Sequence, residues 1–155
     1  MSSHHQLKEC FSLFSTGVMI AATNYNGHNY GLTINSFSSV SLDPPLCLFS
    51  IGSNSHSLEA FKNSGSFTLS ILSSQQKDLA SKFASHDHES KWQNCDIRSS
   101  KLENPIFNNC NGFFECSNYK IVEAGDHHIF IGEIIDFAKE NDEQGLLYYK
   151  GSFIS

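Results

Sequence analysis

Two long runs of strand-forming residues, 113–124 and 127–137, occupy most of the last third of the chain, and only Gly125-Asp126 separates them. Isoleucine, valine, phenylalanine and tyrosine are enriched in strands. A short pair containing glycine between two such runs is typical of a hairpin corner. We therefore predict two long strands that pair through a hairpin.

Shorter segments upstream repeat this alternation of strands and turns. Asn26-Gly27 lies between two apolar runs and predicts a tight hairpin. The predicted strands are 18–23, 30–36, 46–51, 66–72 and 146–149. Helices are predicted near the N-terminus, where Leu7, Cys10, Phe11 and Phe14 share a helical face, and at about 57–63 and 74–84. The polar region 85–104 has no clear period and is predicted to be a loop.

Many strands with few short helices predict a mainly β fold, an antiparallel β-barrel. A chain of 155 residues is long enough to bury a real core. We see no internal repeat and no domain boundary, so we expect a single domain over residues 1–155.

Charge and cysteine content restrict the partners. Ten Lys and Arg stand against sixteen Asp and Glu, for a net charge of -6. Nucleic-acid and membrane-surface binding need a basic stripe, and neither is expected here. No export signal is recognisable. An odd count of five cysteines without close pairs argues against disulfides, so we expect a reducing, cytoplasmic location.

A polar and aromatic set follows the second predicted strand. Thr33, Asn35 and Phe37 would share one side of an extended strand, because side chains alternate. A hydroxyl, an amide and an aromatic ring on one face suit a flat heteroaromatic ligand. The spacing alone fits ordinary polar residues at a barrel mouth better.

Two further segments carry polar groups that suit a ligand. Ser55 and Ser57 precede a predicted helix, where hydroxyls and free N–H groups can hold an anion, although helix capping is the commoner role. Lys82 on the next predicted helix is the cation available for a phosphate. His127, after Gly125-Asp126, can hydrogen-bond a ligand at the barrel rim or be an exposed strand residue.

Metal and nucleophile chemistry are poorly supported. The histidines and cysteines lack the short paired spacing of structural zinc sites, so no metal is expected. Cys47 lies in an apolar strand and is predicted to be a core residue. Neither a phosphate loop nor a GxGxxG motif after a strand occurs.

Taken in order, these segments resemble the short-chain flavin reductases, the reductase components of two-component flavin-dependent monooxygenases. The resemblance covers nearly the whole chain. The matching segments are Phe14-Ser-Thr-Gly-Val18, Gly31-Leu-Thr-Ile-Asn-Ser-Phe37, Ser39-Val-Ser-Leu-Asp-Pro-Pro-Leu46, Phe49-Ser-Ile51, Lys82-Phe-Ala84, Phe114-Glu-Cys116, Gly125-Asp-His127 and Tyr148-Tyr-Lys-Gly151. Residues 85–103 depart from the family pattern.

The resemblance implies a Greek-key split β-barrel that binds FMN or FAD, forms a homodimer and takes hydride from NADH or NADPH. Reduced flavin would pass to a partner monooxygenase. The implied flavin contacts are Thr33, Asn35, Ser36 and Phe37, with Ser50 and Ile51 contributing mainly backbone. The implied phosphate contacts are Ser55, Ser57 and Lys82. His127 would line the nicotinamide side, and Tyr149 is a weaker candidate.

Two alternatives to a reductase follow from the same residues. The first is a flavin-binding module without nicotinamide-dependent turnover, which would keep the flavin contacts and lack a working nicotinamide site. The atypical region 85–104 is the reason to consider it. A barrel-like protein-interaction module would bind no flavin.

Overall fold

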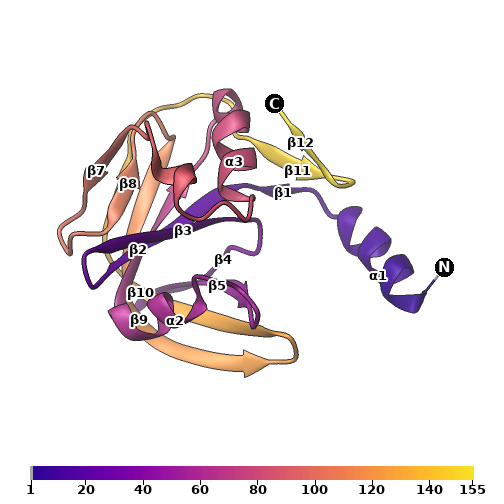
Figure 1. Cartoon of the computed structure of the whole chain (residues 1–155), viewed down its shortest axis with the longest axis horizontal. Helices are drawn as coiled ribbons and strands as arrows, with labels where there is room; N and C mark the ends of the chain where they lie inside the picture. The colour runs from indigo at the N-terminus through magenta and orange to yellow at the C-terminus, as the bar shows by residue number, and fades with distance from the viewer. Residues whose placement is uncertain (1) are drawn as a thin grey trace.

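The computed structural model describes residues 2–155 and is built mainly from antiparallel strands (Figure 1). The helices are α1 (Ser3–Ser12), α2 (Leu58–Ser64) and α3 (Lys77–Phe83), with 3-10 turns η1 (Ser74–Gln76) and η2 (Ser90–Trp92). The strands are β1 (Thr16–Gly17), β2 (Met19–Tyr25), β3 (His28–Ile34), β4 (Ser38–Leu42), β5 (Pro45–Gly52), β6 (Ser66–Ile71), β7 (Ile97–Ser99), β8 (Pro105–Phe107), β9 (Gly112–Ala124), β10 (His127–Lys139), β11 (Leu147–Tyr149) and β12 (Ser152–Ile154). The predicted mainly β fold is confirmed. No helix among residues 2–155 has the length and apolar character needed to cross a bilayer.

The main sheet has seven strands in the order β3-β2-β6-β9-β10-β5-β4, and every neighbouring pair is antiparallel. Both predicted hairpins are confirmed. The long β9–β10 hairpin turns at Gly125-Asp126, and β2 pairs with β3 from Tyr25↔His28. Asn26 and Gly27 have φ values of 54° and 80°, which are the left-handed values that such a two-residue turn requires.

This sheet has to curl, because its two edge strands are consecutive in the chain. A flat sheet of seven strands would hold β3 and β4 about 29 Å apart. Residues 35–37 join them and can span only about 14 Å. The sheet therefore wraps around a core. The edge strands β3 and β4 are joined by this connector. Within residues 2–155 they are not paired with each other by hydrogen bonds, unlike the neighbouring strands of the sheet.

Apolar side chains fill both sides of the first part of β2, which explains why residues 19–22 are apolar without alternation. Met19 and Ala21 face the core enclosed by the sheet, where Phe49, Phe61 and Phe130 pack against one another. The alternate residues of β2 face a second core under α3, made of Val18, Ile20, Ala22, Leu72, Ala80, Phe83, Phe107, Cys110 and Leu146.

Gly132 permits close packing in the enclosed core. A Cβ at this position would lie 2.6 Å from Phe67 Cζ and 2.7 Å from Cys116 Cβ. Across the space that it leaves, the sulfur atoms of Cys47 and Cys116 lie 3.6 Å apart. Cys47 is 1% exposed, so its predicted place in the core is confirmed.

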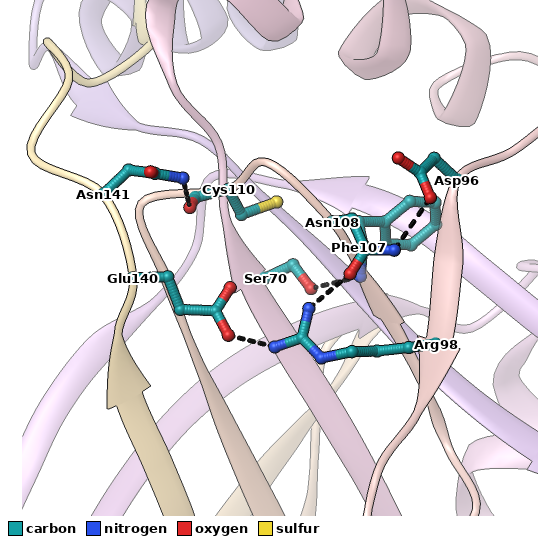
Figure 2. A network of polar contacts seen from close by, with 8 residues as sticks. All are labelled: Ser70, Asp96, Arg98, Phe107, Asn108, Cys110, Glu140 and Asn141. Atoms are coloured by element: carbon teal, nitrogen blue, oxygen red, sulfur yellow. Dashed lines mark hydrogen bonds and ion pairs between the residues drawn. The ribbon is translucent and has the colours of Figure 1, made fainter.

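The region predicted as a loop, 85–104, is partly ordered by long-range contacts. It contains η2 and also β7, which pairs with β8. Figure 2 shows the network that fixes β7: Arg98 forms an ion pair with Glu140 and donates to Asn108 Oδ1 at 2.5 Å, while Asn108 Nδ2 donates to Asp96 Oδ1 at 2.8 Å. The buried Glu115 carboxylate anchors the following residues by accepting from Ser100 Oγ and the Leu102 N–H.

Candidate functional site

The connector 35–37 lies where the two edges of the sheet meet. The second predicted strand was expected to run to Ser36, but β3 ends at Ile34, so Asn35 and Phe37 do not continue one strand face. Ser36 Oγ accepts from the Ser50 N–H at 2.9 Å, which fastens the connector to β5. The Phe37 ring stacks on Phe114 at 5.7 Å and packs against the enclosed core.

Beside this connector is a hollow of about 470 Å³, which we call the connector hollow. Asn35, Ser36 and Phe37 line one side of it, and Phe14 and Thr16 line the other. Three predicted flavin contacts therefore share this hollow. Ser50 contributes the backbone N–H that Ser36 accepts from, whereas the Ile51 side chain is fully buried and leaves only its backbone for contacts.

A second cavity, the serine groove, measures about 600 Å³ and lies between residues 52–57 and the end of α3. It brings together three predicted ligand contacts, Thr33, Ser55 and Ser57. Thr33 Oγ1 donates to Ala80 O at 2.6 Å, which ties β3 to α3. Ser55 Oγ accepts from the Ser57 N–H at 3.2 Å and so holds the turn before α2.

The lysine of the serine groove is Lys91, not the predicted Lys82. Lys91 is only 3% exposed and lines the groove; its Nζ lies 3.4 Å from His88 Nδ1 and 5.4 Å from the centre of the Phe83 ring. Burial lowers the pKa of Lys91 below the usual lysine range. Lys82 instead donates to Gln93 O at 2.7 Å and does not line this groove. The sequence did not predict Lys91 as a groove residue. Residues 85–104 show no periodicity from which the orientation of its side chain could be predicted.

The two cavities have a common neighbour. A smaller hollow of about 200 Å³ shares Thr33 and Ala84 with the serine groove and shares Asn35 with the connector hollow. A row of three neighbouring cavities therefore runs from the connector 35–37, along the end of β3, to Ser55 and Lys91. The connector end combines the Phe14 and Phe37 rings with polar side chains, and the other end offers hydroxyls and a cation.

His127 lies beside the serine groove, which its neighbours Gly52 and Asp126 line. It pairs with Gly52 across β10 and β5, and a Cβ on Gly52 would lie 3.9 Å from His127 Nε2. Its Nδ1 lies 2.7 Å from Asp126 Oδ1, and this hydrogen bond lowers the pKa of the Asp126 carboxyl. That pairing leaves Nε2 for a ligand. Tyr149 belongs to the separate β1-β11-β12 sheet and lines neither the groove nor the connector hollow.

The residues predicted to contact a flavin ring line the connector end of this row of cavities, and predicted phosphate contacts Ser55 and Ser57 line the other end. Residues 11–155 match the flavin reductase like domain family. The chain belongs to this family.

Comparison with individual proteins supports the same assignment. The flavin reductase-like chain is 38% identical over 150 residues to a probable flavin reductase of Rhizobium meliloti, covering 96% of this chain and 48% of that protein. It is 35% identical over 151 residues to the reductase component of a flavin-dependent trigonelline monooxygenase of Acinetobacter baylyi, with 97% and 48% covered. The chain thus spans about half the length of these two curated relatives.

A solved structure extends the likeness to the fold. An NADH:FAD oxidoreductase of Streptomyces globisporus, in complex with NAD and FAD fragments, matches this flavin reductase-like chain with a TM-score of 0.93 and 30% identity, over 99% of this chain and 92% of that one. The resemblance found in the motifs is therefore confirmed at the level of family and fold.

Proposed function

We propose that this chain is an NADH- or NADPH-dependent flavin reductase that reduces FMN or FAD. The observation that carries the proposal is the row of neighbouring cavities from the connector 35–37 to Lys91. Within it, the predicted ring contacts and phosphate contacts occupy opposite ends. The names of the relatives, a flavin reductase and a monooxygenase reductase component, support the same activity.

The two ends of this row of cavities would contact different parts of the flavin. Asn35 and the Ser36–Phe37 backbone would orient the flavin ring, and Thr33 would lie beside the chain that links ring and phosphate. Ser55, Ser57 and Lys91 would hold the phosphate, because hydroxyl donors and an ammonium are its usual partners. Bound flavin supplies the hydride chemistry itself, accepting hydride from a nicotinamide stacked on its open face.

His127 is assigned to the nicotinamide side as a positioning residue. Asp126 fixes its Nδ1, so Nε2 remains available at the groove rim. Hydride transfer needs no protein acid or base, and the demand on the protein is alignment of two rings at roughly 3–3.5 Å.

Oxidation of NADH or NADPH, followed at 340 nm with FMN or FAD as acceptor, tests the activity. Turnover with at least one nicotinamide and one flavin is expected. Protein that binds flavin but oxidises neither nicotinamide would instead be a flavin-binding module. Protein that binds no flavin would refute the site itself.

The proposed assembly is a homodimer. Helix α1 projects from the sheet (Figure 1), has no buried residue and exposes Leu7 and Phe11. Phe14, which follows this helix, is exposed as well. A second copy that covers this face would also cover the connector hollow, which Phe14 lines. Sedimentation should give twice the chain mass, and Phe11→Ser should shift it toward the monomer. A monomeric wild-type protein would contradict the proposal.

The physiological setting is likewise a proposal. Reduced flavin would pass to a partner monooxygenase, as the name of the Acinetobacter relative implies for that protein. The five free cysteines suit a reducing cytoplasm, and residues 1–155 would act as one flavin reductase-like domain. An oxygenase purified with this protein should gain activity when the reductase, flavin and nicotinamide are added together, and not when any one is omitted.

A further inference from the structure

Gly31 lies in β3 at the place where the turn η2 covers this strand. Tyr30 and Leu32 pack against the enclosed core, so the alternating position 31 faces the opposite side of the strand. A Cβ at Gly31 would lie 2.9 Å from Trp92 Cζ2 and 3.3 Å from Ala21 O. Gly31 does not have the positive φ that would by itself strain an alanine. The close approach of the indole is therefore what requires a glycine here.

Packing alone holds the indole of Trp92. Its Nε1 atom is buried and has no hydrogen-bond partner within residues 2–155. The indole lies 4.8 Å from the Phe83 ring at an interplanar angle of 84°, and 5.7 Å from the Phe107 ring. Both phenylalanines are buried, so they cannot move aside into solvent. The contact with Gly31 therefore determines how closely η2 lies against β3.

Lys91 precedes Trp92 in the same turn and packs on the same phenylalanine. Its ammonium lies 5.4 Å from the centre of the Phe83 ring. The Phe83 ring thus contacts both the indole and the ammonium that is proposed to hold the phosphate. One turn of 3-10 helix carries both side chains. A displacement of the indole relative to Phe83 therefore moves the ammonium as well.

We propose that Gly31 is a positioning residue for the flavin phosphate, because the space that it leaves for the indole of Trp92 sets the place of the Lys91 ammonium. This inference rests on the proposed flavin site. Carbon atoms in contact lie about 3.5–4.0 Å apart, so a methyl group at position 31 has to displace the indole, and η2 with it, by about 0.6 Å or more. Binding groups have to be held within about 0.5 Å of their productive geometry. The displacement is therefore large enough to weaken contact with a phosphate.

Titration with FMN and with riboflavin, which has the same ring and no phosphate, tests the proposal without turnover. Gly31→Ala is expected to raise the Kd for FMN roughly 3- to 30-fold and to leave the Kd for riboflavin unchanged. Gly145→Ala is the matched control and should change neither Kd, because a Cβ at Gly145 would have no atom within 4 Å. Adding Trp92→Phe to Gly31→Ala removes the two indole atoms nearest to the new methyl group. This double variant should bind FMN within about threefold of the wild type, because the two changes act on one contact.

Two further measurements separate the positioning of Lys91 from a general loss of stability. Trp92 is the one tryptophan of the chain, so its fluorescence should shift to longer wavelength in Gly31→Ala as the indole moves toward solvent. Burial lowers the pKa of Lys91 in the wild type. A less buried ammonium in Gly31→Ala should keep its proton to higher pH, so the weakening of FMN binding with rising pH should begin later than in the wild type. His88 and Asp87, which also act on this ammonium, are unchanged in the variant.

Equal losses of FMN and riboflavin binding in Gly31→Ala, or no loss of either, would overturn this inference. The proposed phosphate site would stand in that case if Lys91→Met still lost FMN binding alone, and would fail with the inference if it did not. If Gly31→Ala does not fold, Trp92→Phe tests the same contact from the other side, because the shorter ring leaves a gap at Gly31. Adding Gly31→Ala to Trp92→Phe should then tighten FMN binding, and the absence of any gain would overturn the inference.

Discussion

Replacing Lys91 by methionine should separate recognition of the flavin phosphate from recognition of the ring. The Lys91 side chain is 3% exposed, and among the ion pairs of residues 2–155 none includes its ammonium. Its polar neighbour is the imidazole of His88 at 3.4 Å. A buried cation without a carboxylate in contact has already lost its hydration, so an anionic ligand gains the full benefit of pairing with it.

The magnitude follows from the loss of one charge-assisted hydrogen bond, about 1.5–3 kcal/mol. At about 1.4 kcal/mol per factor of ten, the Kd for FMN should rise by roughly 10- to 150-fold. Methionine retains most of the buried stem and packs against Phe83 in place of the ammonium, so the variant should fold. Its free energy of unfolding should be equal to or above that of the wild type, because an unpaired buried charge is removed.

The assay compares FMN with riboflavin, which has the same ring and no phosphate. Lys91→Met should weaken FMN binding and leave riboflavin binding unchanged. Lys82→Met is the matched control, since Lys82 donates to Gln93 O and does not line the groove. Equal losses for FMN and riboflavin in Lys91→Met, or a phosphate-specific loss in Lys82→Met, would refute the assignment of the phosphate to Lys91. Because burial lowers the pKa of Lys91, FMN binding should also weaken with rising pH before ordinary lysines titrate.

Three further predictions concern other parts of the site. His127→Ala should slow flavin reduction by NADH roughly 10- to 100-fold in stopped-flow traces, through lost alignment, while the Kd for flavin stays constant; parallel losses of rate and affinity would contradict its role. Ser36→Ala should cost about 1 kcal/mol in urea unfolding, because the Ser50 N–H loses its acceptor, and should also weaken flavin binding at the connector. His88→Asn should flatten the pH dependence of stability between about pH 5 and 7. Burial, Lys91, His56 and His86 lower the pKa of His88 in the folded state, so the unfolded state binds more protons in this range and stability falls with falling pH in the wild type.

Local signals predicted the elements that local chemistry determines. The hairpin at Asn26-Gly27 needs positive φ at both positions, and the long β9–β10 runs carry enough β-branched and aromatic residues to be recognised. Strand β4 was missed because Ser38–Leu42 is short and rich in serine, and because it lies largely exposed at an edge of the sheet. The two-residue strand β1 is too short for any periodic signal.

The sequence could predict that Ser55 and Ser57 lie together in the candidate site, but it could not predict which lysine lies beside them. Ser55 and Ser57 precede α2 in sequence, so their place at one turn is local information. Lys91 reaches the same groove only because residues 85–104 are anchored to distant strands, through Arg98 to Glu140 and through Ser100 to Glu115. Such anchoring is decided by side chains more than ten positions away, which no pattern within the segment reveals.

The net charge of -6 raises the question of how this chain attracts anionic ligands at all. Exposed lysines would contribute little at physiological ionic strength, because salt screens them beyond about 8 Å. One ammonium on a buried side chain acts at a lower effective dielectric, where the same charge interacts several times more strongly. The serine hydroxyls would then orient the phosphate by donating hydrogen bonds, without adding charge. A phosphate held mainly by one desolvated cation and neutral donors should bind with moderate strength, which suits a flavin that has to leave after reduction. The same arrangement makes the loss of Lys91 the most damaging single change expected at the phosphate end.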